Sequence, residues 1–290
     1  MRRQGRLPLK GRRLFIFMKI LRKATLCNTE GIKITTMEIS APDIAAKVRA
    51  GQFVVLMTGE KGERIPLTVV DSNNSSGSIT LIFQEVGLTT KLLGKLEVGG
   101  ELHALAGPLG HATEVKKYGK VILVGGGVGI AEIYPVAKAL KGAGNEITVI
   151  LGARTKNLLI LEAELKGSSD RLLVATDDGS YERRGFTTDI LAELLAKDKY
   201  DLVYAVGPIP MMKRVADVTK NSGTSTVVSL NALMVDATGM CGCCRVTVGG
   251  EVKFSCVDGP EFEASLVDWD GLIKRNRVYA DKEKHLCKLV

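Results

Sequence analysis

Apolar residues in the first third of the chain occur in short runs separated by turn-forming residues. Ile32, Ile34 and Thr36 alternate with other positions, as on a strand with one buried face. Further strand-like runs cover residues 52–57, 78–83 and 101–106. Several short strands separated by turns are typical of an antiparallel barrel or sandwich. We therefore expect an all-β domain over residues 18–114.

The pattern changes at Gly119. A wholly apolar run at 121–124, typical of a buried parallel strand, leads into the glycine-rich turn 125–129. Apolar residues then recur at helical spacing, at Ile130, Ile133, Ala137 and Leu140. Strand, glycine turn and helix form the arrangement that seats a nucleotide phosphate. The dinucleotide-binding fingerprint is incomplete, because its third glycine position holds Ile130.

Three more strand-like runs, at 146–151, 172–176 and 202–206, are each followed by a loop of glycine or charged residues. In an open α/β sheet, ligands bind at the carboxyl ends of the strands. The sequence therefore predicts a parallel α/β nucleotide-binding domain over residues 115–224. Each of these loop residues, taken alone, is typical of an ordinary loop. Together, six of them are expected to line one crevice: Gly126, Gly127, Arg154, Asp177, Gly207 and Met211.

The barrel segment contains a weak motif, Arg64-Ile-Pro-Leu-Thr68, at the start of a strand. Its arginine suits a diphosphate, and the proline and the hydroxyl suit a flat ring. Read in isolation, Arg64 is a solvated charge and Thr68 a strand former. The run Gly87-Leu-Thr-Thr90 predicts a helix start with threonine as its cap and free amides for a phosphate.

Composition and charge narrow the class of protein. The 290 residues, 45% hydrophobic and 25% charged, suit a globular protein of two or three domains. The net charge of +8 includes six positive charges within residues 1–17, leaving +2 for the remainder. We interpret 1–17 as a basic tail, or as an upstream reading of the start codon. Neither a nucleic-acid partner nor a membrane is expected.

The most specific motif is Asp236-Ala-Thr-Gly-Met-Cys241-Gly-Cys-Cys244, followed by Cys256. Its spacing is that of a plant-type [2Fe-2S] loop in which aspartate replaces the first cysteine. Glycines in such a loop let backbone amides approach inorganic sulfide. We predict Asp236, Cys241, Cys244 and Cys256 as the cluster ligands. An alternative takes Cys243 as the fourth ligand in place of Asp236.

Two other interpretations of the cysteines are weaker. A structural zinc site, with His285 as a further ligand, would normally show two Cys-x2-Cys pairs, and only one is present. Disulfides are disfavoured because the cysteines are bunched and no secretory signal is recognisable, which indicates a reducing, cytoplasmic environment. Cys27 and Cys287 are interpreted as ordinary thiols. The histidines are scattered, and no catalytic residue is predicted.

Taken in order, the motifs from Arg64 to Cys256, together with Gly107-Pro-Leu-Gly110 and Asp177-Asp-Gly179, resemble the ferredoxin–NADP reductase-like electron-transfer subunits. The resemblance covers residues 18 to about 275. Cysteine in the first ligand position marks the dihydroorotate dehydrogenase B branch. Aspartate there is similar to the branch of the bifurcating NADH-dependent reduced ferredoxin:NADP oxidoreductase and sulfide dehydrogenase. Cys243 and Glu132 depart from the usual family residues, the latter from a proline.

This resemblance implies an oxidoreductase subunit with FAD, a [2Fe-2S] cluster and NAD(H) or NADP(H). It implies that Arg64, Pro66, Leu67 and Thr68 contact FAD, and that Thr89 and Thr90 lie near its diphosphate. Gly126, Gly127 and Asp177 belong to the nicotinamide nucleotide site, and residues 225–290 form the cluster subdomain. A larger flavoprotein or iron–sulfur subunit is the expected partner, with ferredoxin reached through the complex. The alternatives are a dihydroorotate dehydrogenase B subunit and a zinc-stabilised nucleotide-binding module.

Overall fold

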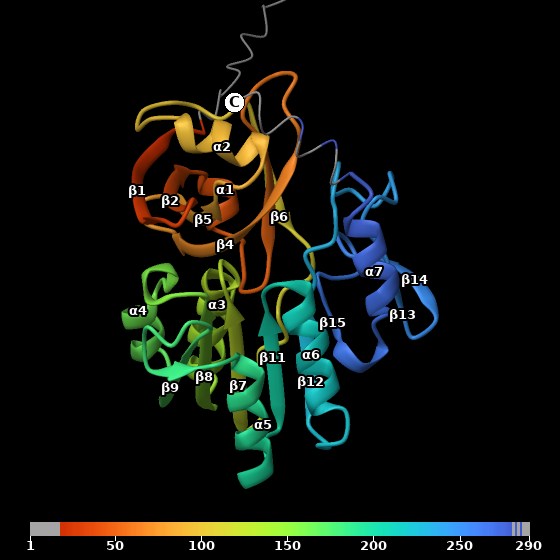
Figure 1. Cartoon of the computed structure of the whole chain (residues 1–290). Helices are drawn as coiled ribbons and strands as arrows, with labels where there is room; N and C mark the ends of the chain where they lie inside the picture. Colours follow the sequence, from red (N-terminus) through yellow and green to blue (C-terminus); the bar gives the residue numbers. More distant parts are fainter. Residues whose placement is uncertain (1–17, 280–281, 283–284, 286–290) are drawn as a thin grey trace, which may run out of the picture.

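A computed structural model describes residues 18–279 together with 282 and 285 (Figure 1). The predicted basic tail, residues 1–17, and Cys287 lie outside the described residues. The N-terminal part is an antiparallel sheet in the order β1-β2-β5-β4-β3-β6. Its elements are β1 (Ile20–Thr29), β2 (Ile32–Ser40), β3 (Phe53–Met57), β4 (Ile65–Asn73), β5 (Ser78–Gln84) and β6 (Ala104–Leu109), with helices α1 (Pro42–Ala45) and α2 (Leu88–Lys95).

The sheet closes on itself. Lys19, just before β1, bridges Glu101, just before β6, and Ile20 N donates to Gly100 O at 2.9 Å. One apolar cluster fills the interior, including Met37, Val54 and Leu81. The predicted all-β barrel is therefore confirmed, because the alternating pattern of the sequence places one side chain in two toward this core.

The predicted parallel α/β architecture is also confirmed, but its sheet extends beyond the predicted segment 115–224 to include residues 225–229 and 261–263. Its sheet has the order β10-β9-β8-β7-β11-β12-β15, parallel except for the last pair. The strands are β7 (Lys120–Gly126), β8 (Glu146–Ala153), β9 (Arg171–Thr176), β10 (Arg183–Arg184), β11 (Leu202–Val206), β12 (Ser225–Ser229) and β15 (Glu261–Glu263). The connecting helices are α3 (Gly129–Gly142), η1 (Lys156–Leu158), α4 (Glu162–Gly167), α5 (Thr187–Lys197) and α6 (Ile209–Thr219).

Helices cover both faces of this sheet. On β7, Val121 and Leu123 belong to the cluster that α3 packs against, while Ile122 and Val124 belong to the cluster with α5 and α6. Successive side chains of a strand point to opposite faces, so a strand buried on both sides reads as a continuous apolar run. That is the physical basis of the 121–124 run in the sequence.

The C-terminal part is bound to the same sheet. It contains a hairpin of β13 (Arg245–Val248) and β14 (Glu251–Phe254), then β15, η2 (Ala264–Leu266) and α7 (Trp269–Asn276). Strand β15 pairs antiparallel with β12, and Cys244 and Cys256 are buried in the cluster that also holds α5 and α6. In Figure 1 this part, drawn in blue, lies beside β12 and α6. No helix in the described part of the chain is long and apolar enough to cross a membrane.

Candidate functional site

The nucleotide crevice lies where the strand order reverses, between β7 and β11. Gly125 at the end of β7 is in register with Val206 at the end of β11, and both strands point toward the barrel (Figure 1). A cavity of about 670 Å³ opens there. Five of the six residues expected from strand ends line it: Gly126, Gly127, Arg154, Asp177 and Met211.

Gly207 is the sixth, and it does not line the cavity. A Cβ at Gly207 would come within 2.7 Å of Met211 Cε. Gly126 is similarly constrained, because a Cβ on it would overlap Met211 Sδ. The two strand-to-helix turns therefore pack together through these glycines, and Met211 closes the space between them.

Two groups of lining residues were not expected from the sequence. The start of α5 contributes residues 185–189, and the barrel contributes Ile32, Ile34 and Gln84. The α5 contribution had a local signal, because Thr187 and Thr188 precede Asp189, whose carboxylate accepts from Phe186 N at 3.0 Å at the helix start. The barrel contribution had none, since it depends on how the two domains pack.

Four charged residues line the crevice: Arg154 and Asp177 at the ends of β8 and β9, Asp189 of α5 and Arg214 of α6. Burial raises the pKa of Asp177, the Arg154 guanidinium opposes this, and Asp178 adds to it. A guanidinium beside a carboxylate gives a site for ribose hydroxyls at the carboxylate and for phosphate oxygens at the arginine.

The flavin motif lies on β4, the barrel strand that contacts α3. Pro66 and Leu67 are half-buried and pair with Val55 and Val54 of β3, while Arg64 just before the strand is exposed. A half-buried apolar strand with a free guanidinium at its start and a hydroxyl at Thr68 fits a flat ring carrying a diphosphate.

The helix start predicted at residues 87–90 is confirmed, but its N-cap is Gly87 and not a threonine. Helix α2 has Gly87 as its N-cap, and Thr90 Oγ1 accepts from Gly87 N at 2.9 Å from within the first turn. The hydroxyl of Thr89 donates to Glu63 at 2.9 Å. Both threonine hydroxyls thus make local hydrogen bonds. Gly87 itself has no side chain with which to cap the helix.

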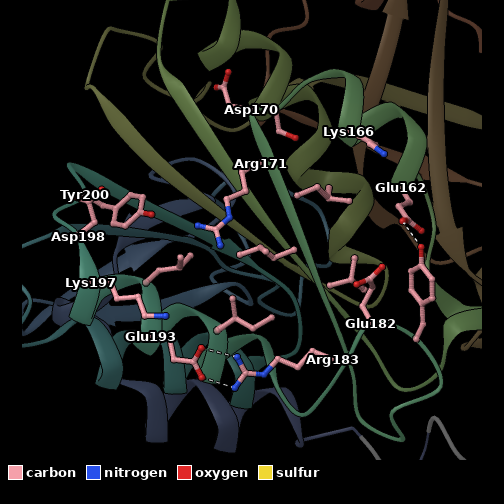
Figure 2. Close-up of a pocket in the computed structure, with 17 residues that line it drawn as sticks. Glu162, Lys166, Asp170, Arg171, Glu182, Arg183, Glu193, Lys197, Asp198 and Tyr200 are labelled. Atoms are coloured by element: carbon pink, nitrogen blue, oxygen red, sulfur yellow. Dashed lines mark hydrogen bonds and ion pairs between the residues drawn. The ribbon is translucent and has the colours of Figure 1, made fainter.

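A second hollow, of about 830 Å³, lies outside this site (Figure 2). It follows the N-terminal half of β9, since β10 pairs only with Ala175 and Thr176 and leaves the rest of that edge uncovered. Its rim is charged and internally paired, with Arg183 Nη2 2.6 Å from Glu193 Oε1. Charged side chains at a free strand edge protect it from pairing. It holds none of the predicted site residues.

The predicted metal ligands form two pairs, with three of the residues in the loop 236–244 and Cys256 directly after the β13–β14 hairpin. The carboxylate of Asp236 hydrogen-bonds Cys241, and the thiols of Cys244 and Cys256 hydrogen-bond each other. A hydrogen bond from Thr238 N at 2.9 Å holds the pKa of Asp236 below its usual value, so this ligand is anionic. Cys241 is exposed, whereas Cys244 and Cys256 are buried.

The loop backbone is shaped to wrap around a ligand. Gly242 has φ +63°, and Arg245 and Arg275 donate to the carbonyls of Gly242 and Cys243 at 3.0 and 2.9 Å. Positive φ favours glycine here, and the two guanidinium groups place positive charge beside the thiols. Met240, at the tip of the loop, is 88% exposed.

This donor set fits a two-iron cluster better than a single zinc ion. Among the described residues, no three Cys, His, Asp or Glu side chains converge on one point closely enough to hold one metal ion. A structural zinc requires four ligands around one point. In a [2Fe-2S] cluster the ligands are divided between two irons, which suits two separate pairs.

Comparison with known proteins identifies the family. The model of the iron–sulfur cluster binding domain of dihydroorotate dehydrogenase B matches residues 231–268, and that of the oxidoreductase NAD-binding domain matches residues 123–217. A dihydroorotate dehydrogenase B electron transfer subunit homolog from Thermotoga maritima is 51% identical over 246 residues, which cover 85% of this chain and 87% of the relative. The chain belongs to the family of dihydroorotate dehydrogenase B electron-transfer subunits.

Other family members and solved structures agree with this assignment. The electron transfer subunit from Geobacillus thermodenitrificans is 32% identical and covers 80% of this chain and 91% of its own length. A chain of the NADH-dependent reduced ferredoxin–NADP oxidoreductase, solved in a study of flavin-based electron bifurcation, is 45% identical with a TM-score of 0.87, covering 92% of this chain and 95% of that one. A cytochrome P450 reductase from Amycolatopsis, at 21% identity and TM-score 0.61, shares the fold.

Family membership confirms the predicted class of function. The chain is an electron-transfer subunit of an oxidoreductase, and its cofactors are FAD, an iron–sulfur cluster and NAD(H). When bound, the flavin supplies the conversion between two-electron and one-electron chemistry. The protein supplies binding, orientation and the local charges described above.

Proposed function

We propose that this chain passes electrons between NAD(H) and a larger partner subunit, through FAD and a [2Fe-2S] cluster, in the cytoplasm. The observation that supports this best is that one chain joins a switch-point crevice, a half-buried β4 strand that contacts α3, and two pairs of predicted metal ligands. The division of labour follows the segments 18–114 for FAD, 115–224 for the nucleotide and 225–290 for the cluster.

The two pairs of ligands suggest how the cluster is held. Asp236 and Cys241 would bind one iron, and Cys244 and Cys256 the other. The first pair lies on the exposed side of the loop and the second is buried against the sheet. The exposed iron, beside Met240, is then the natural exit for electrons toward a partner.

The complex that we favour is an NADH-dependent reduced ferredoxin:NADP oxidoreductase, with ferredoxin as a substrate of the larger subunit. This rests on the aspartate in the first ligand position and on the 45% identity over nearly the whole of the corresponding solved chain. The second candidate is a dihydroorotate dehydrogenase B, which the names of many relatives favour. Assay of the purified complex for dihydroorotate oxidation and for NADPH-dependent ferredoxin reduction separates the two.

The cofactor content of the isolated chain tests the proposal. Anaerobically prepared protein is expected to contain one FAD, two irons and two acid-labile sulfides per chain. Addition of NADH should bleach the flavin absorption first and that of the cluster afterwards. A colourless protein containing zinc would instead support the zinc-stabilised binding module and overturn the redox function.

Asp177 is expected to select NADH over NADPH. A 2′-phosphate placed between Arg154 and Asp177 would be attracted by one and repelled by the other. Asp177→Asn removes a repulsion of about 1–2 kcal/mol, which corresponds to roughly a tenfold gain for NADPH relative to NADH. Flavin reduction rates with the two nucleotides measure this ratio. Asp178→Asn, at the exposed neighbouring carboxylate, is the control, and an equal change in both variants would contradict the assignment.

Asp236 is expected to set the potential of the cluster. Carboxylate oxygen donates less electron density to iron than thiolate does, so Asp236→Cys should keep the cluster and lower its reduction potential. Potentiometric titration of the parent and the variant measures the difference. Equal potentials, with an intact cluster in both, would show that Asp236 does not bind iron.

A further inference from the structure

Glu132 is a half-buried ionisable group that the nucleotide site and the cluster leave unused. It lies in the first turn of α3, a helix that contacts β4 of the barrel. The residue is half-buried, and burial raises the pKa of its carboxyl group. That carboxyl is hydrogen-bonded to Thr68, the last residue of the flavin motif. Glu132 therefore reaches the predicted flavin site from the opposite domain.

The groups around Glu132 come from three elements. Tyr204, on β11, is buried and lies within electrostatic range of both Glu132 and Glu261 of β15. Glu261 Oε1 accepts from the hydroxyls of Tyr204 at 2.8 Å and of Thr113 at 2.5 Å. Where α3 meets β4, the ammonium group of Lys138 already has a carboxylate partner, because its Nζ lies 2.9 Å from Asp71 Oδ1.

Tyr204 thus lies near two partly buried carboxyl groups, those of Glu132 and Glu261, which differ in their hydrogen bonds. Burial raises the pKa of both. Glu261 has two hydroxyl donors, which favour its charged form, whereas Glu132 has only Thr68. The pKa of Glu132 is raised to about 7 as a result, chiefly by burial, with the Thr68 hydrogen bond opposing it. Glu132 is therefore the carboxyl that changes charge near neutral pH.

We propose that Glu132 is a redox-linked proton site of the flavin, so that it binds a proton when the flavin is reduced and releases it when the flavin is reoxidised. This inference rests on the proposed FAD site at Arg64–Thr68. In reduction, the C4–H bond of the nicotinamide breaks, hydride forms the N5–H bond, and the flavin becomes an anion. The carboxylate of Glu132 takes one proton from water and becomes neutral. In reoxidation two electrons pass to the cluster and on to the partner, and the N5 proton and the Glu132 proton return to water.

Electrostatics gives the reason for this coupling. A negative charge on a flavin ring that contacts Thr68 disfavours a second negative charge on Glu132, which is hydrogen-bonded to the same threonine. FAD bound on β4 would also exclude remaining water from the carboxyl, which strengthens the interaction between the two charges. The neutral acid of Glu132 then offsets the charge of the reduced flavin, and the flavin accepts electrons more readily as the pH falls.

The number of protons bound per two electrons tests the proposal. It is obtained from the pH dependence of the flavin midpoint potential, followed by absorbance in anaerobic titrations of the complete chain. Anionic reduced flavin alone binds one proton per two electrons. For the parent we expect this number to rise from one at about pH 6 toward two above about pH 7, where Glu132 is ionised while the flavin is oxidised. Glu132→Gln is expected to give one proton throughout.

Control variants separate this role from a structural one. Glu132→Asp retains a carboxyl and should retain the second proton, and Glu261→Gln and the exposed Glu146→Gln should behave as the parent. One proton throughout in the parent, or loss of the second proton in Glu261→Gln instead, would overturn the inference while leaving FAD binding intact. Absence of bound FAD would overturn the proposed function as well.

An infrared measurement removes any dependence on the folding of Glu132→Gln. The redox difference spectrum of the parent protein should show a carboxylic acid C=O band that appears on flavin reduction. A difference spectrum without such a band at pH 7.5 would contradict the proposal even if every variant failed to fold.

Discussion

Replacement of Cys244 by serine is expected to remove the iron–sulfur cluster, with loss of nearly all iron, acid-labile sulfide and visible cluster absorption. Cys244 is buried, and its thiol contacts that of Cys256, so its loss takes half of one iron's protein ligands. Iron and sulfide analysis of anaerobically prepared protein measures the effect, while the flavin content should remain that of the parent.

Cys243→Ser is the matched control, because Cys243 is the neighbouring thiol and is only partly buried. Its backbone N donates to Cys241 Sγ at 3.4 Å and its carbonyl accepts from Arg275, contacts that a serine keeps. We expect it to retain two irons per chain. If Cys243→Ser loses the cluster and Asp236→Ala keeps it, Cys243 is the fourth ligand and the assignment of Asp236 is wrong.

Replacement of Arg64 by alanine is expected to weaken FAD binding by roughly ten- to a hundredfold. A charge-assisted hydrogen bond to a diphosphate contributes about 1.5–3 kcal/mol. Arg64 is exposed at the start of β4 and no ion pair of the described residues engages it, so the variant should fold normally. Titration of the apoprotein with FAD, followed by flavin fluorescence, gives the dissociation constant.

Arg22→Ala provides the comparison for this experiment. Arg22 is also exposed on the barrel, on β1, where its guanidinium lies 3.4 Å from Glu38. Its replacement should leave the FAD dissociation constant unchanged. Equal affinities in all three proteins would show that the diphosphate lies elsewhere on the barrel.

Local patterns in the sequence predicted the elements more accurately than the side-chain contacts. The apolar run at 121–124 and the helical spacing after it gave β7 and α3, because a strand buried on two faces and a helix buried on one leave different periods. The strand expected at 101–106 begins instead at Ala104, since Glu101 forms an isolated bridge to Lys19 that closes the barrel. That closure depends on residues more than 80 positions apart.

In the candidate site, too, local patterns predicted the position of residues along the sheet better than their side-chain contacts. Six strand-end residues were predicted to line the crevice, since parallel strands end at the same edge of the sheet, and five of them do. Gly207 is not among the lining residues, and a Cβ there would come within 2.7 Å of Met211 Cε. The threonine cap of α2 was wrong because Gly87 occupies that position and Thr90 bonds to it from within the helix.

By itself, the sequence determined the kind of chemistry. The spacing of one aspartate and three cysteines, the glycine turn after an apolar strand, and the order of the motifs can all be identified before the fold is known. Only the tertiary structure decided which groups meet across domains. It brought Ile34 and Gln84 into the nucleotide cavity, joined β15 to β12, and placed Glu132 against Thr68. Such contacts depend on the packing of one domain against another, and that packing leaves no periodicity in the chain from which it could be read.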